Sequence, residues 1–295
     1  MAWRRLGLVY APGGEADWLI SHASVPFAEP IEGGLHRIWF SPRDRQNRSH
    51  VAWIVVDLER PQQVLEHSPG PILGCGPMGA FDDCGAMMSW LAAGRLYYIG
   101  WNTRSTVPYQ VSIGLAESDG HTLRRVDGPI LERSPADPWF CSNPCVLPDG
   151  RRWRMWYLSG LGWNEIGGQW SPSYRICTAV SADGRDWTDR GQVAIDLEGN
   201  EYALARPSVL RDGDGWLMWF CARTRERPYR LAAARSADGI TWTRAPELAG
   251  LEPAADGWDS EMVAYPHVFE HGGRRWMLYC GNGFGRSGFG LAVWE

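Results

Sequence analysis

The sequence predicts an all-β protein folded as a five-bladed β-propeller, with four antiparallel strands in each blade. Three observations support this prediction. The 295 residues include 35 Gly, 20 Pro and 18 Trp, a composition typical of short strands joined by turns. One pattern of segments recurs five times, at intervals of roughly 60 residues. The N-terminal segment also resembles the part that the last repeat lacks.

Each repeat begins with a predicted hairpin, in which an anchor position precedes an apolar strand, a Gly-containing turn and an aromatic-rich strand. The second strand is apolar on both faces, as expected for a strand between neighbouring sheets. The hairpin segments are VPFAEPIEGGLHRIWFSPRD, MMSWLAAGRLYYIGWN, NPCVLPDGRRWRMWYLS, RPSVLRDGDGWLMWFCAR and YPHVFEHGGRRWMLYCGN. Their anchors are Pro26, Met88, Pro144, Pro207 and Pro266, of which Met88 is the one departure from proline.

A third strand and a turn complete the predicted unit. The third strands are SIGLA, YRICTAV, YRLAAA and GFGLAVW. A turn of the form SxDGxxW follows in three repeats, as ESDGHTL, SADGRDW and SADGITW. Asp and Gly favour the tight turn, and Trp187 or Trp242 is expected to pack at the start of a fourth strand.

The last repeat stops after its third strand, at GLAVWE. The N-terminal segment AWRRLGLV aligns with DWTDRGQV, so that Trp3 takes the place of Trp187 and Trp242. The N-terminus is therefore predicted to supply the missing fourth strand, which would remove two open sheet edges. Residues 1–295 are predicted to form a single propeller domain.

The composition argues against several partners. All 29 basic residues are Arg, they are dispersed, and the net charge is −5, which disfavours nucleic-acid binding. No apolar run is long enough to span a membrane, and the N-terminus does not resemble a signal peptide. The seven cysteines are scattered, which favours reduced thiols over disulfides or zinc. We therefore expect a cytoplasmic protein.

Ligands of propellers usually bind at the mouth of the central channel, where the innermost strands begin. Residues just before each anchor should converge there, together with residues at the far end of each hairpin. These predicted ligand-binding residues are His22, Arg43, Asp44, Asp82, Trp101, Trp139, Asn143, Arg206, Arg223, Asp259 and Asn282. Carboxylates and arginines would hold hydroxyls or an anionic group, and the tryptophans would stack on ring faces.

Three acids are the predicted catalytic residues: Asp83, Glu201 and Glu261. They occur at nearly matching offsets before the anchors of separate repeats. Carboxylates crowded into a partly dry cleft shift each other's pKa values, which suits acid–base catalysis. The alternative for any single acid is that it caps a strand end and hydrogen-bonds to backbone amides.

No cofactor is predicted. His22 with Asp83 and Glu261 could ligate a divalent cation in the channel, but a single His without a repeated spacing favours an ordinary hydrogen-bonded residue.

The repeats, the SxDGxxW turns and strands such as WRMWYLSG resemble those of the five-bladed propeller glycoside hydrolases of families 32, 43 and 130, over essentially the whole chain. The resemblance implies the propeller and activity on a carbohydrate. Catalytic acids of that superfamily usually lie one or two residues before the anchor proline. Here the residues directly before the anchors are Val25, Met87, Asn143, Arg206 and Tyr265, and the residues two before are Ser or Ala. The superfamily's catalytic residues therefore do not carry over to this chain.

Three functions remain open. The first is a glycoside hydrolase-like enzyme that acts on a small glycoside or polyhydroxylated substrate through Asp83, Glu201 and Glu261. The second is a non-hydrolytic biosynthetic enzyme, of lyase, cyclase or transferase type, on the same scaffold. The third is a sugar-binding propeller without catalysis. Fold similarity alone does not choose among them.

Overall fold

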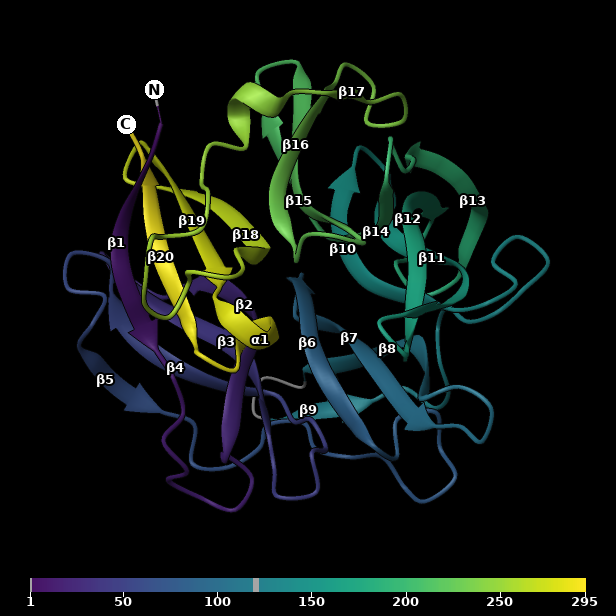
Figure 1. The fold of residues 1–295 in the computed structure, drawn as a ribbon, viewed down its shortest axis with the longest axis horizontal. Coiled ribbons are helices and arrows are strands. Elements are labelled where there is room, and N and C mark those ends of the chain that lie inside the picture. The colour runs from purple at the N-terminus through teal and green to yellow at the C-terminus, as the bar shows by residue number, and fades with distance from the viewer. Residues whose placement is uncertain (1, 119–121) are drawn as a thin grey trace.

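The computed structural model describes residues 2–118 and 122–295 and is almost entirely β-structure (Figure 1). Besides strands β1 to β20 it contains a short 3-10 helix, Pro246–Leu248, and a four-residue helix, α1 (Asn282–Gly285). The predicted all-β class is confirmed. No helix in the described ranges is both long and apolar enough to cross a membrane.

The strands form four sheets arranged around a common centre (Figure 1). Two four-stranded sheets consist of consecutive strands: β2 (Ser21–Pro30), β3 (Leu35–Arg43), β4 (Ala52–Asp57) and β5 (Val64–His67); then β6 (Gly85–Ala92), β7 (Arg95–Thr103), β8 (Tyr109–Ser118) and β9 (Leu123–Arg125). A third combines both ends of the chain: β1 (Trp3–Tyr10), β20 (Phe289–Trp294), β19 (Arg274–Cys280) and β18 (Ala264–His271).

The fourth sheet has eight strands in two groups of four. The first group is β10 (Cys141–Asp149), β11 (Arg152–Ile166), β12 (Gln169–Ser181) and β13 (Trp187–Ile195). The second group is β14 (Glu201–Asp212), β15 (Gly215–Thr224), β16 (Arg230–Ser236) and β17 (Thr243–Arg244). Within each group neighbouring strands are antiparallel, and a single parallel bridge between Tyr174 and Ala203 joins the two groups.

The two termini lie side by side (Figure 1) because β1 pairs antiparallel with β20. Trp3 lies opposite Trp294, and the amide of Glu295 donates a 3.0 Å hydrogen bond to the carbonyl of Ala2. The Trp3 ring packs edge-on against Trp294 and Trp219, at centroid distances of 5.1 and 6.1 Å. The pairing of the N-terminal segment with the last strand, expected from the repeat, is therefore observed.

The five anchors all lie in the first strand of a group, in β2, β6, β10, β14 and β18. These first strands contact one another in a cycle, from β2 to β6, β10, β14, β18 and back to β2. They therefore surround the common centre. The side on which they begin is called the mouth below.

A β-bulge repeats in four of the first strands, directly before the anchor proline. Its residues have positive φ angles of 54°, 44°, 56° and 54° at Val25, Asn143, Arg206 and Tyr265 respectively. The pairing register shifts at each of these points. Proline suits a bulge because it has no N–H to give to the ladder, and a bulge re-aims its side chain. The bulge therefore explains why proline recurs at the anchor positions.

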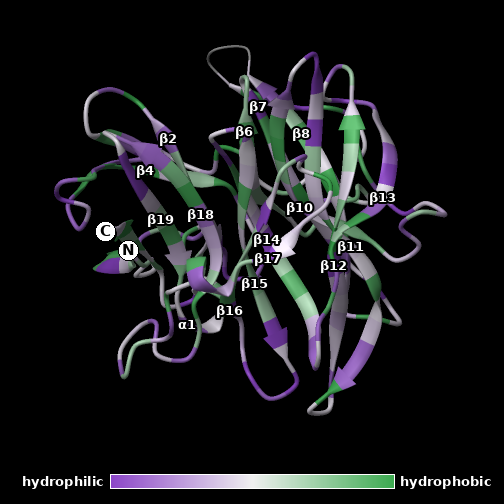
Figure 2. Ribbon diagram, turned by 90° about the horizontal axis from the view of Figure 1, so that it is seen from above, coloured by the Kyte–Doolittle hydropathy of each residue, from purple (hydrophilic) through white to green (hydrophobic). Residues whose placement is uncertain are grey.

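The core consists of buried hydrophobic side chains that pack between the sheets. Hydrophobic residues occur along the strands of these sheets (Figure 2). The largest fully buried side chains include Trp156, Trp219, Tyr98 and Phe220. In the third strand β8, Gly114 lies against the Tyr98 ring, where a Cβ atom would approach ring carbons to 2.2 Å. Apolar burial of this extent is the main stabilising contribution to the fold.

Two of the three predicted SxDGxxW turns are fully described and share one hydrogen-bond pattern. The Asp183 carboxylate accepts from the amides of Arg185 and Asp186, at 2.8 and 3.0 Å, and Ser181 Oγ accepts from Gly184 N at 2.8 Å. Asp238 and Ser236 make the matching bonds in the next repeat. The third turn, ESDGHTL, includes residues 119–121, which lie outside the described residues.

Candidate functional site

The bulge in β14 directs Arg206 into the centre of the molecule. Its side chain is 0% exposed and donates to the carbonyl of Ser89 in β6 and, at 3.2 Å, to that of Pro26 in β2. The guanidinium also lies 5.6 Å from the Trp90 ring centroid. Burial lowers the pKa of Arg206 to about 10. Arg206 therefore stays charged at neutral pH and ties three first strands together.

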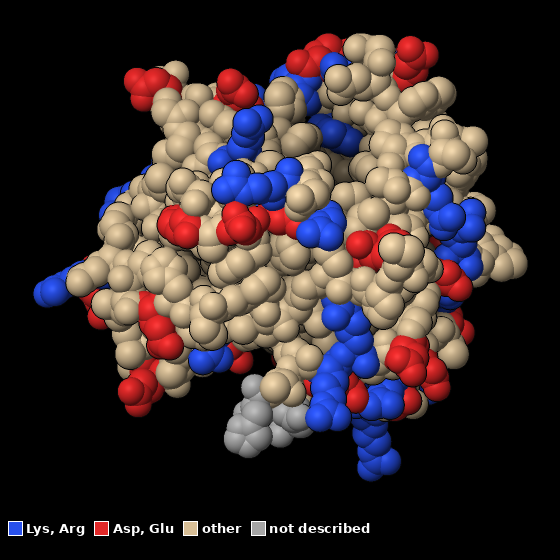
Figure 3. Space-filling model, turned by 90° about the horizontal axis from the view of Figure 1, so that it is seen from below, with Lys and Arg blue, Asp and Glu red and all other residues tan. Residues whose placement is uncertain are grey.

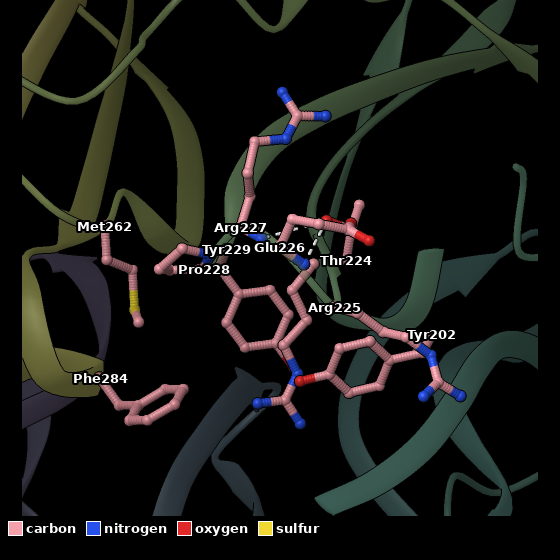
Figure 4. Close-up of a pocket in the computed structure, with 10 residues that line it drawn as sticks. Tyr202, Thr224, Arg225, Glu226, Arg227, Pro228, Tyr229, Met262 and Phe284 are labelled. Carbon is pink, nitrogen blue, oxygen red and sulfur yellow. Dashed lines mark hydrogen bonds between the residues drawn. The ribbon is translucent and has the colours of Figure 1, made fainter. Parts of the chain in front are cut away.

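A cleft of about 260 Å³ opens beside the end of β15 (Figure 4). Arg223 lines it, and its guanidinium carbon lies 4.6 Å from the ring centroid of Tyr202 and 4.9 Å from that of Tyr229. Met262 and Phe284 form the opposite wall, and the loop of residues 224–228 forms the rim. The cleft thus combines one half-buried cation with several ring faces.

Aromatic side chains from different sheets pack together behind this cleft. Tyr229 lies 5.8 Å from Tyr265 and 6.1 Å from Phe284 between ring centroids, and its hydroxyl hydrogen-bonds with that of Tyr174. Burial raises the pKa of both Tyr229 and Tyr265 well above the ordinary value. These hydroxyls therefore remain neutral hydrogen-bonding groups across the physiological range.

A second arginine, Arg43 at the end of β3, faces the same cluster. It donates a 2.9 Å hydrogen bond to Asn47 Oδ1 and lies 5.9 Å from the Trp101 ring centroid. Burial lowers its pKa, and the nearby Tyr265 and Tyr109 act in the opposite direction. Arg43 and Trp101, both predicted from the sequence, are thus in contact.

Arg43 and Arg223 both affect the pKa of one buried tyrosine, Tyr109. Burial raises the pKa of Tyr109, while Arg223 and Arg43 both oppose that shift, so both guanidiniums act on the same hydroxyl. Burial, together with the charges of Arg43 and Arg286, lowers the pKa of His22 to about 4. His22 is therefore neutral at pH 7. A space-filling view shows arginine side chains within a hollow of the surface (Figure 3).

Two of the predicted ligand-binding acids lie in buried ion pairs instead of facing this cluster. Asp82 accepts from Tyr98 Oη and Arg125 Nε, at 2.9 and 2.8 Å. Asp259 accepts from Tyr279 Oη and Arg5 Nε, at 3.1 and 3.0 Å. The two carboxylates are 1% and 3% exposed.

The same motif occurs in a third group of strands, where Asp137 accepts from Tyr157 and Arg190. In each case a carboxylate before the first strand pairs with a tyrosine of the second strand and an arginine of the fourth. Arg5 takes the fourth-strand position although it belongs to β1. The Asp–Tyr–Arg contacts therefore recur as a structural motif that links strands within a group.

Glu201 takes a related place in the β14–β17 group. Its carboxylate pairs with Arg244 of β17 at 2.8 Å and accepts from the amide of Glu198 at 2.9 Å. Glu201 also lines a second cleft, of about 430 Å³, which shares Thr224 and the loop of residues 227–228 with the cleft of Arg223. Glu201 and Arg223 therefore lie on opposite sides of one loop.

The other two predicted catalytic acids lie near different parts of the cluster. Asp83 Oδ2 accepts from Gly79 N at 2.9 Å, whereas Oδ1 is buried and has no partner in the described part of the chain. The next residue, Cys84, donates from its amide to the Trp101 carbonyl, so Asp83 lies on the Arg43 side. Glu261 is exposed and precedes Met262 of the cleft wall.

The remaining predicted residues have separate surroundings. Asp44 is buried and accepts from Arg48 and His50, and Asn282 Oδ1 accepts from the amides of Glu261 and Met262. Trp139 is 48% exposed, and its carbonyl accepts from Gln110. Asn143 occupies a bulge position, and its buried Oδ1 has no hydrogen-bond partner within residues 2–118 and 122–295.

Within residues 2–118 and 122–295, no group of three or more His, Cys, Asp or Glu side chains is placed to hold a metal ion. His22, Asp83 and Glu261 are thus not brought together as a cation site.

Sequence reasoning missed the tyrosines of the cluster: Tyr109, Tyr174, Tyr202, Tyr229 and Tyr265. Two of them carried a readable signal. Tyr265 directly precedes an anchor proline, and Tyr202 directly follows Glu201. The others lie near strand ends that approach the cluster only in three dimensions.

Two proteins of Mycobacterium tuberculosis are similar to the chain over its whole length. "Uncharacterized protein Rv1502" of strain ATCC 25618 / H37Rv and "Uncharacterized protein MT1551" of strain CDC 1551 / Oshkosh are each 45% identical over 302 residues, with 100% of both chains covered. The chain belongs to the family of these proteins. No family model matches this member of the family.

Solved structures similar to this family member are β-propeller glycoside hydrolases. A structure titled "Glycoside hydrolase" matches with a TM-score of 0.73 at 17% identity, covering 99% of the present sequence and 91% of its own. An α-L-arabinofuranosidase from Podospora anserina, in complex with cellotriose, matches with a TM-score of 0.66 at 9% identity, with coverage of 99% and 96% respectively. A thermostable family-43 glycoside hydrolase matches with a TM-score of 0.63 at 14% identity, with coverage of 93% and 88%. The resemblance to propeller glycoside hydrolases is therefore confirmed for the fold.

Proposed function

We propose that this protein is a carbohydrate-active enzyme that acts on a small glycoside or polyhydroxylated substrate bound at the mouth. The observation that carries the proposal is the cluster of arginines and aromatic rings there, on a fold shared with glycoside hydrolases. A concave site with ring faces and a few polar groups is the usual form of a small-molecule site. Hydroxyl groups of a sugar would accept hydrogen bonds from the guanidiniums.

The proposal includes a single domain, residues 1–295, with five blades. The cyclic contacts of the five first strands support it, since each first strand would then be the innermost strand of one blade. The position of Arg5 in the ion-pair motif supports β1 as a fourth strand. On this basis the eight-stranded sheet is two blades linked by one bridge.

For catalysis we propose the carboxylates predicted from the sequence, Asp83, Glu201 and Glu261. Asp83 and Glu261 lie near the Arg43 and Arg223 sides of the cluster respectively. Asp83 has a buried oxygen without a hydrogen-bond partner among the described residues. Glu201 faces the adjoining cleft from its ion pair with Arg244. One acid would protonate the leaving oxygen, and another would activate water.

Amide substitutions test this assignment. Asp83→Asn, Glu201→Gln and Glu261→Gln are assayed against a panel of 4-nitrophenyl glycosides, with Asp214→Asn, in the exposed β14–β15 turn, as the control. Loss of a general acid or base should lower kcat by about 100-fold or more, whereas the control should retain the wild-type rate. Wild-type turnover in all three variants would remove the catalytic assignment.

A non-hydrolytic enzyme is the second candidate, because none of the residues directly before the anchors is an acid and the cluster consists of Arg, Tyr and neutral His. The two candidates differ in whether water is consumed. Turnover in ¹⁸O-labelled water should introduce the label into the product of a hydrolase, and an unlabelled product would favour the second candidate.

A further inference from the structure

Among the described residues, Arg43 and Arg223 are half-buried arginines near the mouth without a carboxylate partner, and unlike the fully buried Arg206 they are not held by carbonyls of neighbouring first strands. Arg5, Arg125 and Arg190 each pair with an aspartate. Among the described residues neither Arg43 nor Arg223 forms an ion pair, and the Nε atom of each is buried without a hydrogen-bond acceptor. A half-buried cation without a counter-ion is costly, so two such cations in one cluster indicate a place for an anion.

The surroundings of Arg223 are those of a binding site. Its Nη2 atom donates only a long hydrogen bond, 3.4 Å, to the Pro172 carbonyl, and the adjoining loop adds Arg225 and Arg227 to the cleft. Glu226 is the one carboxylate in the cleft lining, and it accepts a 2.7 Å hydrogen bond from Asn200. The Glu226 carboxylate therefore already accepts a hydrogen bond, and the three arginines of the cleft lining outnumber this single acid.

The rest of the cleft suits a sugar ring. Tyr202 and Phe284 line it and are partly exposed, with Phe284 at 41%. Their rings are available to the apolar face of a ligand (Figure 4). The cleft volume, about 260 Å³, is at the lower end of small-molecule sites and fits a ligand of about one ring.

We propose that the mouth binds a sugar that carries a negatively charged group, with Arg223 contacting the anion, Arg43 adding positive charge nearby, and Tyr202 and Phe284 contacting the ring. The inference rests on the proposed carbohydrate function and names its substrate class. Guanidiniums suit this role because their planar donor pairs match the oxygens of a carboxylate, phosphate or sulfate.

Isothermal titration calorimetry at low ionic strength tests the inference. The probes are D-glucuronate, glucose 6-phosphate, inorganic phosphate and D-glucose. The expected result is that at least one anionic sugar binds at least tenfold more tightly than D-glucose. The tighter binder of D-glucuronate and glucose 6-phosphate identifies the preferred charged group. Inorganic phosphate measures the contribution of the anion alone. No anionic binding up to about 10 mM, or equal binding of D-glucose, would overturn the inference.

Two variants link binding to the arginines. Arg223→Gln and Arg43→Gln should each weaken the anionic probe by about 10- to 100-fold, because each removes a charged hydrogen-bond donor. Arg223→Lys should recover part of the loss. Arg151→Gln, which removes an exposed charge in the β10–β11 turn, is the matched control and should bind as the wild type does. Undiminished binding in both Gln variants, with folding confirmed by circular dichroism, would contradict the inference.

The outcome is separable from that of the catalytic proposal, since calorimetry requires no turnover. Anion binding that depends on Arg223 without cleavage of any glycoside would leave the inference standing and remove the hydrolytic form of the proposed function. Cleavage of a neutral glycoside without any anion binding would support the hydrolytic function and contradict the inference.

Discussion

Arg206 illustrates how one residue in a bulge changes what the fold can do. In the enzymes that the sequence resembles, the position directly before the anchor proline often carries a catalytic acid. Here the side chain donates to the carbonyls of Ser89 and Pro26 and is 0% exposed. A carboxylate at this depth, facing carbonyl oxygens, would be repelled. The carbonyl oxygens around this position therefore favour a cationic side chain over a carboxylate.

Two histidines make the stability depend on pH. Burial lowers the pKa of His22 to about 4 and that of His267 well below the ordinary value, with Arg206 and His36 adding to the effect on His267. The His267 ring needs its neutral form, because Nδ1 accepts a 3.0 Å hydrogen bond from Ala28 N.

Between the unfolded pKa, about 6.5, and the lowered folded values, the unfolded chain binds more protons than the folded chain. The free energy of unfolding should therefore fall as the pH falls from about 6.5 toward 4. Urea denaturation at pH 7.5, 6 and 5 measures this effect. His22→Asn should flatten the profile, and an unchanged slope in that variant would refute the contribution of His22.

At the scale of elements, the Asp–Tyr–Arg motif links the first, second and fourth strands of a group. Asp137 is 0% exposed, so its removal leaves Tyr157 and Arg190 without their acceptor. Breaking a buried pair by deleting one partner typically costs about 3–5 kcal/mol. Asp137→Ala should lower the free energy of unfolding by about that amount in a chemical denaturation experiment.

Asp149 provides the comparison for this prediction. It pairs with Arg154 and Arg211 in a partly exposed place, and pairs of that kind contribute about 0–1 kcal/mol. Asp149→Ala should therefore have a much smaller effect. Equal destabilisation by both variants would show that burial does not set the strength of the motif.

The strand pattern was readable from the sequence because each repeat combines apolar and aromatic-rich segments, a Gly-containing turn and an anchor position that is proline in four of the five repeats. The anchors all lie in first strands, and the N-terminal segment that contains Trp3 pairs with the last strand, as the alignment predicts. The partners of the acids were not readable. Asp259 pairs with Arg5, which lies at the other end of the chain, so only the assembled sheets reveal that this carboxylate is neutralised.

At the scale of the whole molecule, net charge and local charge have opposite signs. The chain carries a net charge of −5, yet the cluster at the mouth contains Arg43 and Arg223 without carboxylate partners in the described part of the chain. The residues before the anchors indicated acids at the mouth, because position in the sequence does not reveal their ion pairs. Asp82, Asp259 and Glu201 are paired with arginines of fourth strands. What remains at the mouth is a surface of arginines and aromatic rings, with Asp83 and Glu261 beside it.

The most direct test of anion binding at the mouth is a crystal structure of the protein soaked with D-glucuronate and with glucose 6-phosphate. We expect one of these ligands to lie at the mouth with its charged group on the Arg223 guanidinium and its ring against Tyr202 or Phe284. Ligand density confined to other surfaces, with the guanidiniums of Arg43 and Arg223 contacting only protein atoms, would contradict this expectation.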